Sequence, residues 1–563
     1  MKYYLKKYKG LLAFTIFLAT IASIAFVGIA FILQRILDVA VSGDTDGFSR
    51  VLIISVVYFV ILTLITYVYS YFYYKFIYKI INAVRERVFN GIINRNYADF
   101  NSVNTADYIS ALTNDVKLVE ENYLIPLLDI IQMSVMFIGS LIVMFYFDLI
   151  VAISVVGAIL LMFIVPSVFG AIIQKKQDRF SKKLSEFTSS LKDILSGFET
   201  IKSYSMKPYV ISKFNEKNKT TTNAGFNVGK VTAANESAST FFAIFIQVLV
   251  IFLSAYFIII GRITVGAMIA MIQVSGMLIH PLMLIFDSAP KIKGVKTIIN
   301  RLNKLSEYND NSFIGTKTPT YKKGIYTKNL SFSYKEGKPI LKDITLEIKK
   351  GKRYAIVGKN GCGKSTLVKL ICGYYSNYEG EIKYDERELM ELNYDKLITL
   401  SATIHQNVYM FNESIYDNIC LHSKYSNLEL AEALDASGSI GFIEELPEGI
   451  HTMVDENGKN FSGGQKQRIA VARAIIQGKP ILVLDEGTSA IDMQTAYDIE
   501  SRLLKMKDLT LITITHNLAE DNLKRYDQII FMDNGKVKEV GTFKELMKNQ
   551  GGFYKFSKMK KLK

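Results

Sequence analysis

Six long apolar runs in the first half of the chain limit its fold more than any other feature of the sequence. They cover residues 11–33, 51–74, 124–147, 149–173, 237–261 and 263–286. Four of these runs carry no charged residue, one carries only Asp129, and one has only His280 as a titratable group. Because about 20 apolar residues match the hydrocarbon thickness of a bilayer, each run predicts a membrane-spanning helix. Six such runs are too many for the buried helices of a water-soluble protein.

Basic residues gather on one side of the predicted spans. The first ten residues and the connections 75–123 and 174–236 are rich in Lys and Arg, whereas the short connections carry only Arg35, Arg50 and Arg262. The positive-inside rule therefore places both termini and both long connections in the cytoplasm of a multi-pass protein of the cell (plasma or inner) membrane. Loops beside the lipid bilayer account for the net charge of +15, and we expect no nucleic-acid partner.

The two long cytoplasmic connections are predicted to be helices that continue out of the bilayer. Pro and Gly are scarce in them, and apolar residues recur at helical spacing, as in IINAVRERVFNGIINRN (80–96). We expect each connection to fold back at a short turn, near residues 101–108 and 204–212. In the last span, His280-Pro281 predicts a local distortion, because Pro lacks a backbone donor.

The sequence changes character after the sixth span. A polar segment without periodicity leads to Gly324, and from there short β-rich runs such as RYAIVG alternate with helical segments such as KSTLVKLI. This alternation is typical of an α/β nucleotide-binding domain. The predicted fold class is a membrane α-helical six-span domain fused to an α/β domain. The expected boundaries are 1–300 for the membrane domain, 301–323 for a linker, and 324–563 for the nucleotide-binding domain.

The segment GKNGCGKST, residues 358–366, follows a predicted strand and opens a predicted helix, as a phosphate-binding P-loop requires. Its glycines let backbone N–H groups surround phosphate oxygens. Lys364 can reach the β- and γ-phosphates, and the hydroxyl of Ser365 can bind Mg²⁺. The segment therefore predicts binding of ATP or GTP.

A second segment, PILVLDE at residues 480–486, supplies the matching acidic groups. An apolar strand that ends in Asp485 would place this carboxylate beside the metal ion. The next residue, Glu486, is positioned to polarise a water molecule for attack on the γ-phosphate.

A third segment, FSGGQKQR at residues 461–468, has the features of a helix start that holds an anion. Ser462 offers a hydroxyl, and Gly463 and Gly464 allow backbone to come close to a ligand. A P-loop already lies about a hundred residues earlier, so the sequence raises the question of whose phosphate this second site holds.

The arrangement of FSGGQKQR between a P-loop and LVLDEGTSAID resembles the ATP-binding cassette (ABC) superfamily. With six spans in front, the whole chain resembles a half-size ABC exporter of the bacterial multidrug and lipid-A flippase type, also called a type IV ABC transporter. The resemblance implies a homodimer or heterodimer of half-transporters in which ATP is held between two cassettes. It also implies that the third segment binds the ATP of the opposite subunit.

Further residues are assigned by the same resemblance. Tyr334 would stack on adenine, Gln406 would sense Mg²⁺, His516 would contact the γ-phosphate, and Asp492 would lie near the opposite site. The implied ATP-binding set is Tyr334, Gly358, Lys359, Asn360, Gly361, Cys362, Gly363, Lys364, Ser365, Thr366, Gln406 and Asp485. The implied catalytic residues are Glu486, His516 and Lys364, the implied metal ligands are Ser365, Gln406 and Asp485, and the residues implied for the opposite ATP are Ser462, Gly463, Gly464, Gln465 and Asp492.

Three positions depart from the family pattern: Phe461 stands where Leu is usual, Asp455 where Gly is frequent, and Gly487 where Ala or Pro is common. None of these changes removes a catalytic group, so both sites of a homodimer could hydrolyse ATP. Pairing with a degenerate partner subunit stays open as the alternative.

The transported compound is the part of the function that the sequence leaves open. Polar groups within spans are costly, so they are candidates for substrate or gating roles, with packing against a neighbouring helix as the alternative for each. These groups are Asp129, Gln132, Gln247, Gln273 and His280. We expect an ATP-driven exporter or flippase for an amphipathic or hydrophobic compound, such as a drug, lipid or peptide. The alternatives are an importer built on the exporter fold, for example for a metal chelate, and a regulatory ATPase or gated channel.

Overall fold

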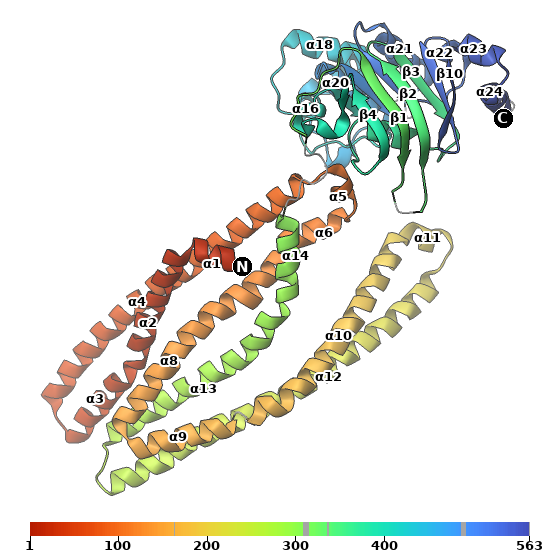
Figure 1. Ribbon diagram of the computed structural model, residues 1–563. Coiled ribbons are helices and arrows are strands. Elements are labelled where there is room, and N and C mark those ends of the chain that lie inside the picture. Colours follow the sequence, from red (N-terminus) through yellow and green to blue (C-terminus); the bar gives the residue numbers. More distant parts are fainter. Residues whose placement is uncertain (163, 308–314, 335–336, 486–490, 562–563) are drawn as a thin grey trace. The chain divides into compact units, whose positions relative to one another are not determined.

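The computed structural model describes residues 1–162, 164–307, 315–334, 337–485 and 491–561 of the chain (Figure 1). The chain divides into two compact units. The helical unit contains Met1–Ile93 and Thr105–Glu307, and the α/β unit contains Asn94–Asn104 and Tyr308–Lys563.

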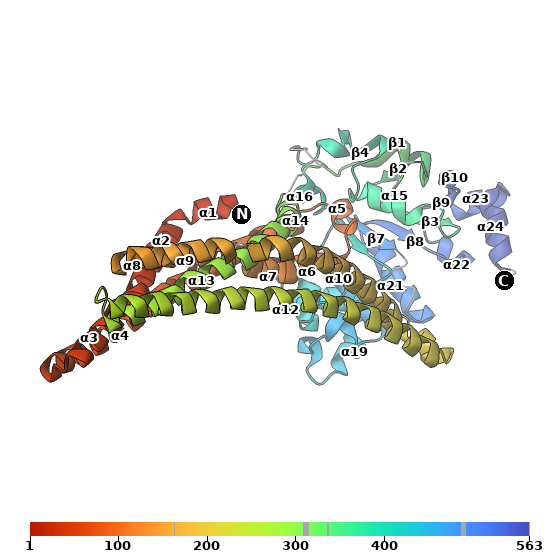
Figure 2. The ribbon, with the colours of Figure 1, turned by 90° about the horizontal axis from the view of Figure 1, so that it is seen from below.

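The helical unit consists of long helices joined by short turns. Its helices are α1 (Lys2–Lys7), α2 (Lys9–Val27), α3 (Ile29–Ser42), α4 (Thr45–Ile93), α6 (Thr105–Ser110), α7 (Val116–Val119), α8 (Ile125–Phe147), α9 (Leu149–Met162), α10 (Ile164–Ser196), α11 (Phe198–Ser203), α12 (Lys207–Ile259), α13 (Val265–Gly294) and α14 (Lys296–Ser306). Two π-helical segments, η1 (Ala111–Asp115) and η2 (Glu120–Leu124), flank α7. In Figures 1 and 2, α10 and α12 run side by side along most of their length.

Among the described residues, five helical stretches are long and apolar enough to cross a membrane. They are Lys9–Ser42, Thr45–Ile93, Thr105–Phe147, Lys207–Ile259 and Val265–Ile285. The remaining predicted span, 149–173, corresponds to α9 and the start of α10, and residue 163 between them lies outside the described residues. Apolar side chains along α4, including Leu52, Ile53 and Val56, are exposed, as expected of a helix that faces lipid.

The prediction that both long connections are helical is confirmed, because α4 and α12 continue well beyond their apolar parts. The first turn lies at 94–104, slightly before the predicted 101–108, since Asn96 caps a short helix there by accepting a hydrogen bond from the Asp99 N–H. The second connection folds back just before α12. Pro208 lies in the first turn of this helix, where its fixed φ angle favours a helix start. The expected distortion at Pro281 does not interrupt α13, which is continuous from Val265 to Gly294.

The α/β unit contains two β-sheets. The four-stranded antiparallel sheet has the order β2 (Leu341–Lys349), β1 (Gly324–Phe332), β4 (Glu379–Tyr384) and β5 (Arg387–Glu388). The six-stranded sheet has the order β10 (Lys536–Gly541), β9 (Gln528–Asp533), β3 (Arg353–Gly358), β8 (Thr510–Ile514), β7 (Ile481–Asp485) and β6 (Ser401–Ile404). Within it only the β10–β9 pair is antiparallel.

Short helices complete the α/β unit. They are α5 (Tyr97–Asn101), α15 (Lys364–Ile371), α16 (Tyr394–Leu397), α17 (Ile415–Cys420), α18 (Asn427–Ala436), α19 (Ile440–Glu444), α20 (Gly463–Ile476), α21 (Met493–Lys505), α22 (Glu520–Leu523), α23 (Phe543–Lys548) and α24 (Gly552–Lys561). Three 3₁₀ turns, Leu389–Glu391, Gly449–His451 and Glu456–Gly458, lie between them.

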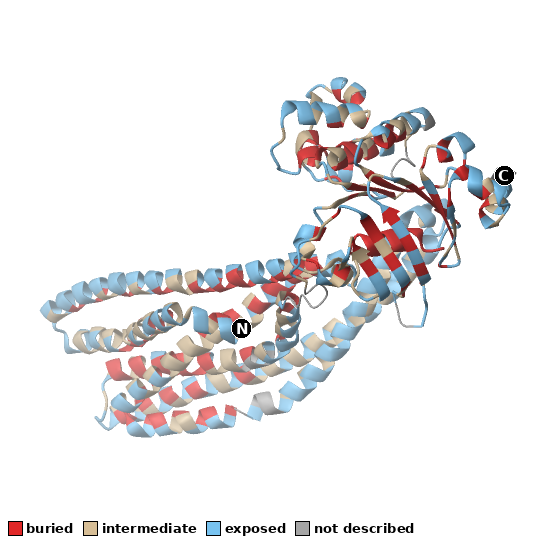
Figure 3. Ribbon diagram, turned by 45° about the horizontal axis from the view of Figure 1, so that its top comes forward, coloured by how far each residue is buried: buried red, intermediate tan, exposed pale blue. Residues whose placement is uncertain are grey.

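The parallel strands carry apolar residues on both faces. On β3, Tyr354 and Ile356 face a core shared with the antiparallel sheet and α15, whereas Ala355 and Val357 face a second core shared with α20 and α21. Side chains alternate between the two faces of a strand, so a strand covered on both sides needs this continuous apolar run. The central strands are accordingly buried in Figure 3.

Within the helical unit, α14 packs closely against α4. A Cβ atom added to Gly91 of α4 would lie 2.3 Å from the carbonyl oxygen of Leu305 and 2.8 Å from the Cα of Ser306. The same helix is tied to the segment after α6, because the Arg301 guanidinium lies 3.2 Å from a carboxylate oxygen of Asp115. Only glycine fits at position 91 without moving backbone.

The Gly91→Ala variant should therefore be less stable than the wild-type protein. Forcing a methyl group into closed packing costs about 1–3 kcal/mol. Gly229→Ala on α12 is the matched control, since an added Cβ there meets nothing within 4 Å and alanine favours a helix. Thermal unfolding of the purified proteins in the same detergent compares the two. A Gly91→Ala protein that melts at or above the temperature of Gly229→Ala would contradict the close approach of α14.

Candidate functional site

The predicted P-loop connects the end of β3 to the start of α15. Gly361 and Gly363 adopt positive φ angles of 75° and 103°, and a Cβ on Gly363 would lie 2.6 Å from the Cδ2 of Leu341. Both positions favour glycine because of their positive φ angles, and position 363 also requires it for space. The buried ammonium group of Lys364 donates hydrogen bonds to the carbonyl oxygens of Gly358 (3.1 Å) and Lys359 (3.0 Å). The loop thus curves around the Lys364 ammonium group, whose positive charge would attract a phosphate.

Two sequence-distant candidates meet directly at this loop. The hydroxyl of Ser365 donates a hydrogen bond of 2.9 Å to Oδ1 of Asp485, the last residue of β7. Hydroxyl and carboxylate oxygens are the ligands that Mg²⁺ prefers. No group of three or more His, Cys, Asp or Glu side chains could hold a metal ion anywhere in the described ranges. Ser365 and Asp485 together offer two oxygen ligands. This small number fits a Mg²⁺ ion that would take further ligands from substrate phosphates.

Other candidates follow the ends of neighbouring parallel strands. Gln406 comes after β6, which ends at Ile404, and His516 comes after β8, which ends at Ile514. Because the carboxyl ends of parallel strands share one edge, both residues lie at the edge of the sheet that carries the P-loop. The predicted catalytic Glu486 lies outside the described residues.

Tyr334 is held beside the P-loop with part of its ring exposed. Its hydroxyl lies 3.1 Å from the Thr366 hydroxyl, and its ring meets the edges of Phe332 and Tyr375 at centroid distances of 4.9 and 5.4 Å. Its exposed fraction of 48% leaves room for a flat group to stack on it. This arrangement suits the predicted contact with a base.

The third segment forms the start of α20. Ser462 and Gln465 make a capping box: the Ser462 hydroxyl accepts from the Gln465 N–H (3.2 Å), and the Gln465 side chain accepts from the Ser462 N–H (2.8 Å). Ser462 and Gly463 are exposed, while the body of α20 is buried among α17, α18 and α19. The structure does not link this helix start to the P-loop by any hydrogen bond among the described residues. It offers the N-terminus of a well-anchored helix to solvent.

Asp492 is an N-cap residue as well. Its side chain accepts a hydrogen bond of 2.9 Å from the Thr495 N–H and so begins α21. This backbone hydrogen bond is the main cause that lowers the pKa of Asp492, so the exposed carboxylate stays charged at neutral pH.

The polar residues of the predicted spans fall into two groups. Tyr73 donates a hydrogen bond of 3.0 Å to Asp129, and Tyr69 donates one of 3.0 Å to Gln132, so both residues tie α8 to α4. Gln247, Gln273 and His280 are exposed on α12 and α13. The contacts of Asp129 and Gln132 support the packing alternative for those two residues.

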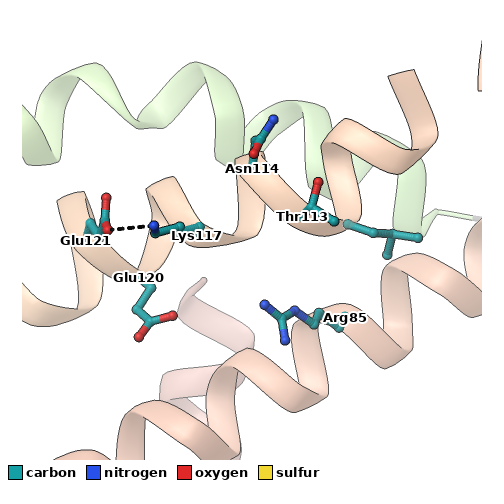
Figure 4. A pocket seen from close by; sticks show the side chains of 7 residues that line it. Arg85, Thr113, Asn114, Lys117, Glu120 and Glu121 are labelled. Atoms are coloured by element: carbon teal, nitrogen blue, oxygen red, sulfur yellow. Dashed lines mark ion pairs between the residues drawn. The ribbon is translucent and has the colours of Figure 1, made fainter. Parts of the chain in front are cut away.

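A cavity of about 580 Å³ lies in the helical unit, on the long connection after the second predicted span. It is lined by Arg85, Leu112, Thr113, Asn114, Lys117, Glu120 and Glu121. Figure 4 shows Arg85 and Glu120 pointing into the same opening from facing helices, while Lys117 pairs with Glu121 at 3.6 Å. Its charged lining does not suit an apolar compound.

An aromatic group beside Tyr334 was missed from the sequence. Tyr374 and Tyr375, which follow α15, contact Tyr97 of α5. The adjacent tyrosines GYY were a visible signal, but only the fold shows what they touch.

Two protein-family models match this chain. The family model described as ABC transporter transmembrane region matches residues 12–282, and the one described as ABC transporter matches residues 341–489. A similar protein is the ATP-dependent lipid A-core flippase of Haemophilus influenzae (strain 86-028NP), which is 27% identical over 93% of this chain and 90% of its own length. A protein named for multidrug export, the ATP-binding/permease protein YgaD of Bacillus subtilis (strain 168), is 27% identical over 97% of this chain and 96% of its own length.

A solved structure shows the same fold. It is described as a bacterial Atm1-family ABC exporter with ATP bound, and it covers 97% of both chains with a TM-score of 0.82. The sequences are 20% identical, so this likeness concerns the fold alone.

The thiol of Cys362 gives a test of the loop geometry. Burial raises its pKa, and the nearby Lys364 ammonium opposes this only in part, so little thiolate exists at neutral pH. In a Cys372→Ala/Cys420→Ala protein, alkylation by N-ethylmaleimide should be slow at pH 7, should rise with pH, and should be slower still with bound ATP. Mass spectrometry measures the rate, and Cys362→Ala is the unreactive control. Labelling at pH 7 as fast as in the denatured chain would show that the thiol is open to solvent.

Proposed function

The chain belongs to the ABC transporters, and from this premise we propose how its parts use ATP to move a compound across the membrane. It joins a multi-pass helical transmembrane domain to an ABC ATPase domain. The predicted fold class, the ATPase activity coupled to transport, and export rather than import or gating are confirmed by the family matches and the relatives. We propose the roles of the individual residues and the class of compound that is transported.

The proposed catalytic centre is the carboxyl edge of the six-stranded sheet. Lys364 and the P-loop glycines bind the phosphates, Tyr334 stacks on adenine, and His516 contacts the γ-phosphate. Ser365, Asp485 and Gln406 would hold Mg²⁺, which would neutralise phosphate charge. Glu486 orients and deprotonates the attacking water. The observation that carries this proposal is the 2.9 Å hydrogen bond between Ser365 and Asp485, since it joins two candidate metal ligands from distant parts of the chain.

The proposed assembly is a dimer in which each ATP lies between two subunits. Its support is the start of α20, formed by Ser462, Gly463, Gly464 and Gln465. Ser462 and Gly463 are exposed there, and among the described residues no hydrogen bond links this helix start to the P-loop of the same chain. Such an N-terminus favours an anion. Asp492, also exposed, would lie near the same composite site. The partner is either a second copy of this chain or a different half-transporter.

The proposed topology keeps both termini and the ATPase domain in the cytoplasm, because Lys and Arg are concentrated in the long connections. The proposed domain boundaries remain 1–300, 301–323 and 324–563. The proposed cargo is an amphipathic or hydrophobic compound, on the analogy of relatives named as lipid A-core flippases and a multidrug export protein.

The Glu486→Gln variant should bind MgATP but hydrolyse it on the order of 10²–10⁴ times more slowly, because an amide cannot take the proton of the attacking water. Phosphate release by the purified transporter gives the rate, and filter binding gives the retained nucleotide. Glu444→Gln, on the exposed surface of α19, is the control and should hydrolyse ATP normally. Near-normal turnover in Glu486→Gln would remove Glu486 from this role.

A mixed dimer tests which ATP the start of α20 serves. One subunit carries Lys364→Ala and the other Ser462→Arg, with Glu486→Gln in both to trap bound ATP. If the start of α20 serves the opposite subunit, both lesions fall in one composite site and the other site stays whole. Doubly tagged mixed dimers should then retain about one ATP each, because the intact helix N-terminus still binds its phosphate.

The two parent homodimers are the controls, and each should retain almost no ATP. Ser462→Arg removes the hydroxyl and fills the space beside the glycines. Mixed dimers that trap no more ATP than the homodimers would mean that each α20 serves its own P-loop.

A further inference from the structure

Asp129 is the only Asp, Glu, Lys or Arg in the six apolar runs. Its hydrogen bond from the Tyr73 hydroxyl occupies one carboxylate oxygen, Oδ1. Among the described residues, the second oxygen accepts no hydrogen bond, no Lys or Arg forms an ion pair with Asp129, and the side chain is only partly buried. A charged group within a membrane-spanning helix is costly and often marks a ligand pathway. Packing of α8 against α4 therefore accounts for only half of this carboxylate group.

Two tyrosine rings lie beside this carboxylate. Tyr69 and Tyr73 meet edge to face, with a centroid distance of 5.9 Å and an interplanar angle of 66°. Tyr69 also donates a hydrogen bond of 3.0 Å to the side chain of Gln132, one turn after Asp129 on α8. Aromatic faces attract organic cations, and a carboxylate adds charge attraction. The group of Tyr69, Tyr73 and Asp129 is therefore suited to bind a positively charged ligand.

The basic residue that follows Tyr73 on α4 is engaged elsewhere. The Lys75 ammonium lies 5.3 Å from the centre of the Tyr71 ring and 5.3 Å from that of Phe72. Lys75 therefore does not neutralise Asp129, and the carboxylate has no cation of its own within the described part of the chain.

An apolar cavity of about 390 Å³ lies between α2 and α4. Its lining includes Ile21 and Ile24 of α2 and Ile61 and Ile65 of α4. Small-molecule sites have volumes of about 300–1,000 Å³, so the cavity is large enough for one compact apolar group. Residues 61, 65, 69 and 73 are spaced by four and share one face of α4. The tyrosine pair thus continues the cavity, with Tyr69 about 6 Å along the helix from Ile65.

The two ends of the cavity differ. At one end the Tyr58 hydroxyl donates a hydrogen bond to the carbonyl oxygen of Ala25, and a Cβ atom added to Gly28 would lie 2.3 Å from this hydroxyl. The helical chain segments therefore touch there. The other end leads toward Asp129, which lies on the cytoplasmic side in the proposed topology. An apolar space is thus followed by an anionic group near the cytoplasmic surface.

We propose that this cavity and Asp129 together bind the transported compound, and that this compound is an amphipathic cation. Its apolar part lies between α2 and α4, and its positive group lies against the second Asp129 oxygen and the rings of Tyr69 and Tyr73. Such a compound in the inner leaflet is already oriented for the site, because its charged group stays near water while its apolar part lies in the lipid. The proposal specifies the cargo of the proposed exporter and rests on that function.

Photolabelling tests the site with two probes of matched shape and opposite charge. The cation is a benzophenone with a trimethylammonium group, and the anion is the same benzophenone with a carboxylate. The purified full chain is labelled in phosphatidylcholine nanodiscs without nucleotide, and mass spectrometry measures the labelled fraction of residues 18–28 and 58–73. In the wild-type protein the cation should label these residues about tenfold more than the anion, because only the cation gains the contacts with Asp129 and the rings.

Two variants separate the charge of Asp129 from its role in packing. Asp129→Asn removes the charge but keeps an oxygen that can accept from the Tyr73 hydroxyl, and it should lower labelling by the cation about tenfold. Tyr73→Phe removes this hydrogen bond but keeps the ring and the charge, and it should leave labelling by the cation intact. A role in packing alone predicts the opposite order. Asp193→Asn, which removes an exposed carboxylate from α10, is the matched control and should label as wild type.

Ala25→Phe tests the apolar half of the site. The larger side chain fills part of the cavity and should lower labelling by the cation although Asp129 is unchanged. This variant keeps the test decisive if Asp129→Asn does not fold.

Equal labelling of the wild-type protein by the two probes would overturn the proposal, as would wild-type labelling by the cation in both Asp129→Asn and Ala25→Phe. Hydrolysis of MgATP by the same wild-type preparation tests the proposed function separately. Its absence would contradict the proposed function, whereas the labelling, measured without nucleotide, would still decide whether the cation binds.

Discussion

The hydrogen bond between Ser365 and Asp485 is the interaction on which the ATPase domain depends most directly. It joins the first turn of α15 to the end of β7, and β8 lies between β7 and the strand that leads into the P-loop. A parallel sheet can bring these groups together only if β3, β8 and β7 are in register, so that their carboxyl ends align. The two apolar cores on either face of the sheet fix that register, because a slip of one residue would turn each side chain to the wrong core.

The membrane imposes the second constraint. Backbone groups in lipid must be satisfied within their own segment, so the apolar half of the chain has no alternative to helices. Helices that continue far beyond the bilayer can carry a short segment such as 94–104 into another domain. Within the α/β unit this segment is held by the stacking of Tyr97 on Tyr374.

Much of this arrangement could be predicted from the sequence because it rests on local patterns. Apolar runs gave the spans, and the P-loop and the acidic strand end gave Lys364, Ser365 and Asp485. The contacts of Tyr97 could not be predicted, since its partners Tyr374 and Tyr375 lie far from it in the sequence and no local pattern near Tyr97 indicates them. The first turn was placed too late for a similar reason: its position depends on the cap at Asn96, a single polar side chain within a helical pattern.

The start of α20 explains why one subunit cannot complete the proposed site. Its capping box uses the Gln465 N–H and the Ser462 N–H, but the N–H groups of Gly463 and Gly464 have no hydrogen-bond partner within the described part of the chain. The Ser462 hydroxyl also keeps its own proton to donate, because it serves the cap as an acceptor. The capping box therefore starts the helix without a ligand, and the helix start retains donors, open to solvent, that can bind an external anion. If that anion is the γ-phosphate of ATP held by another subunit, the start of α20 can bind it only when the two subunits associate. Cleavage of the γ-phosphate then removes the group that holds the two ATPase domains together.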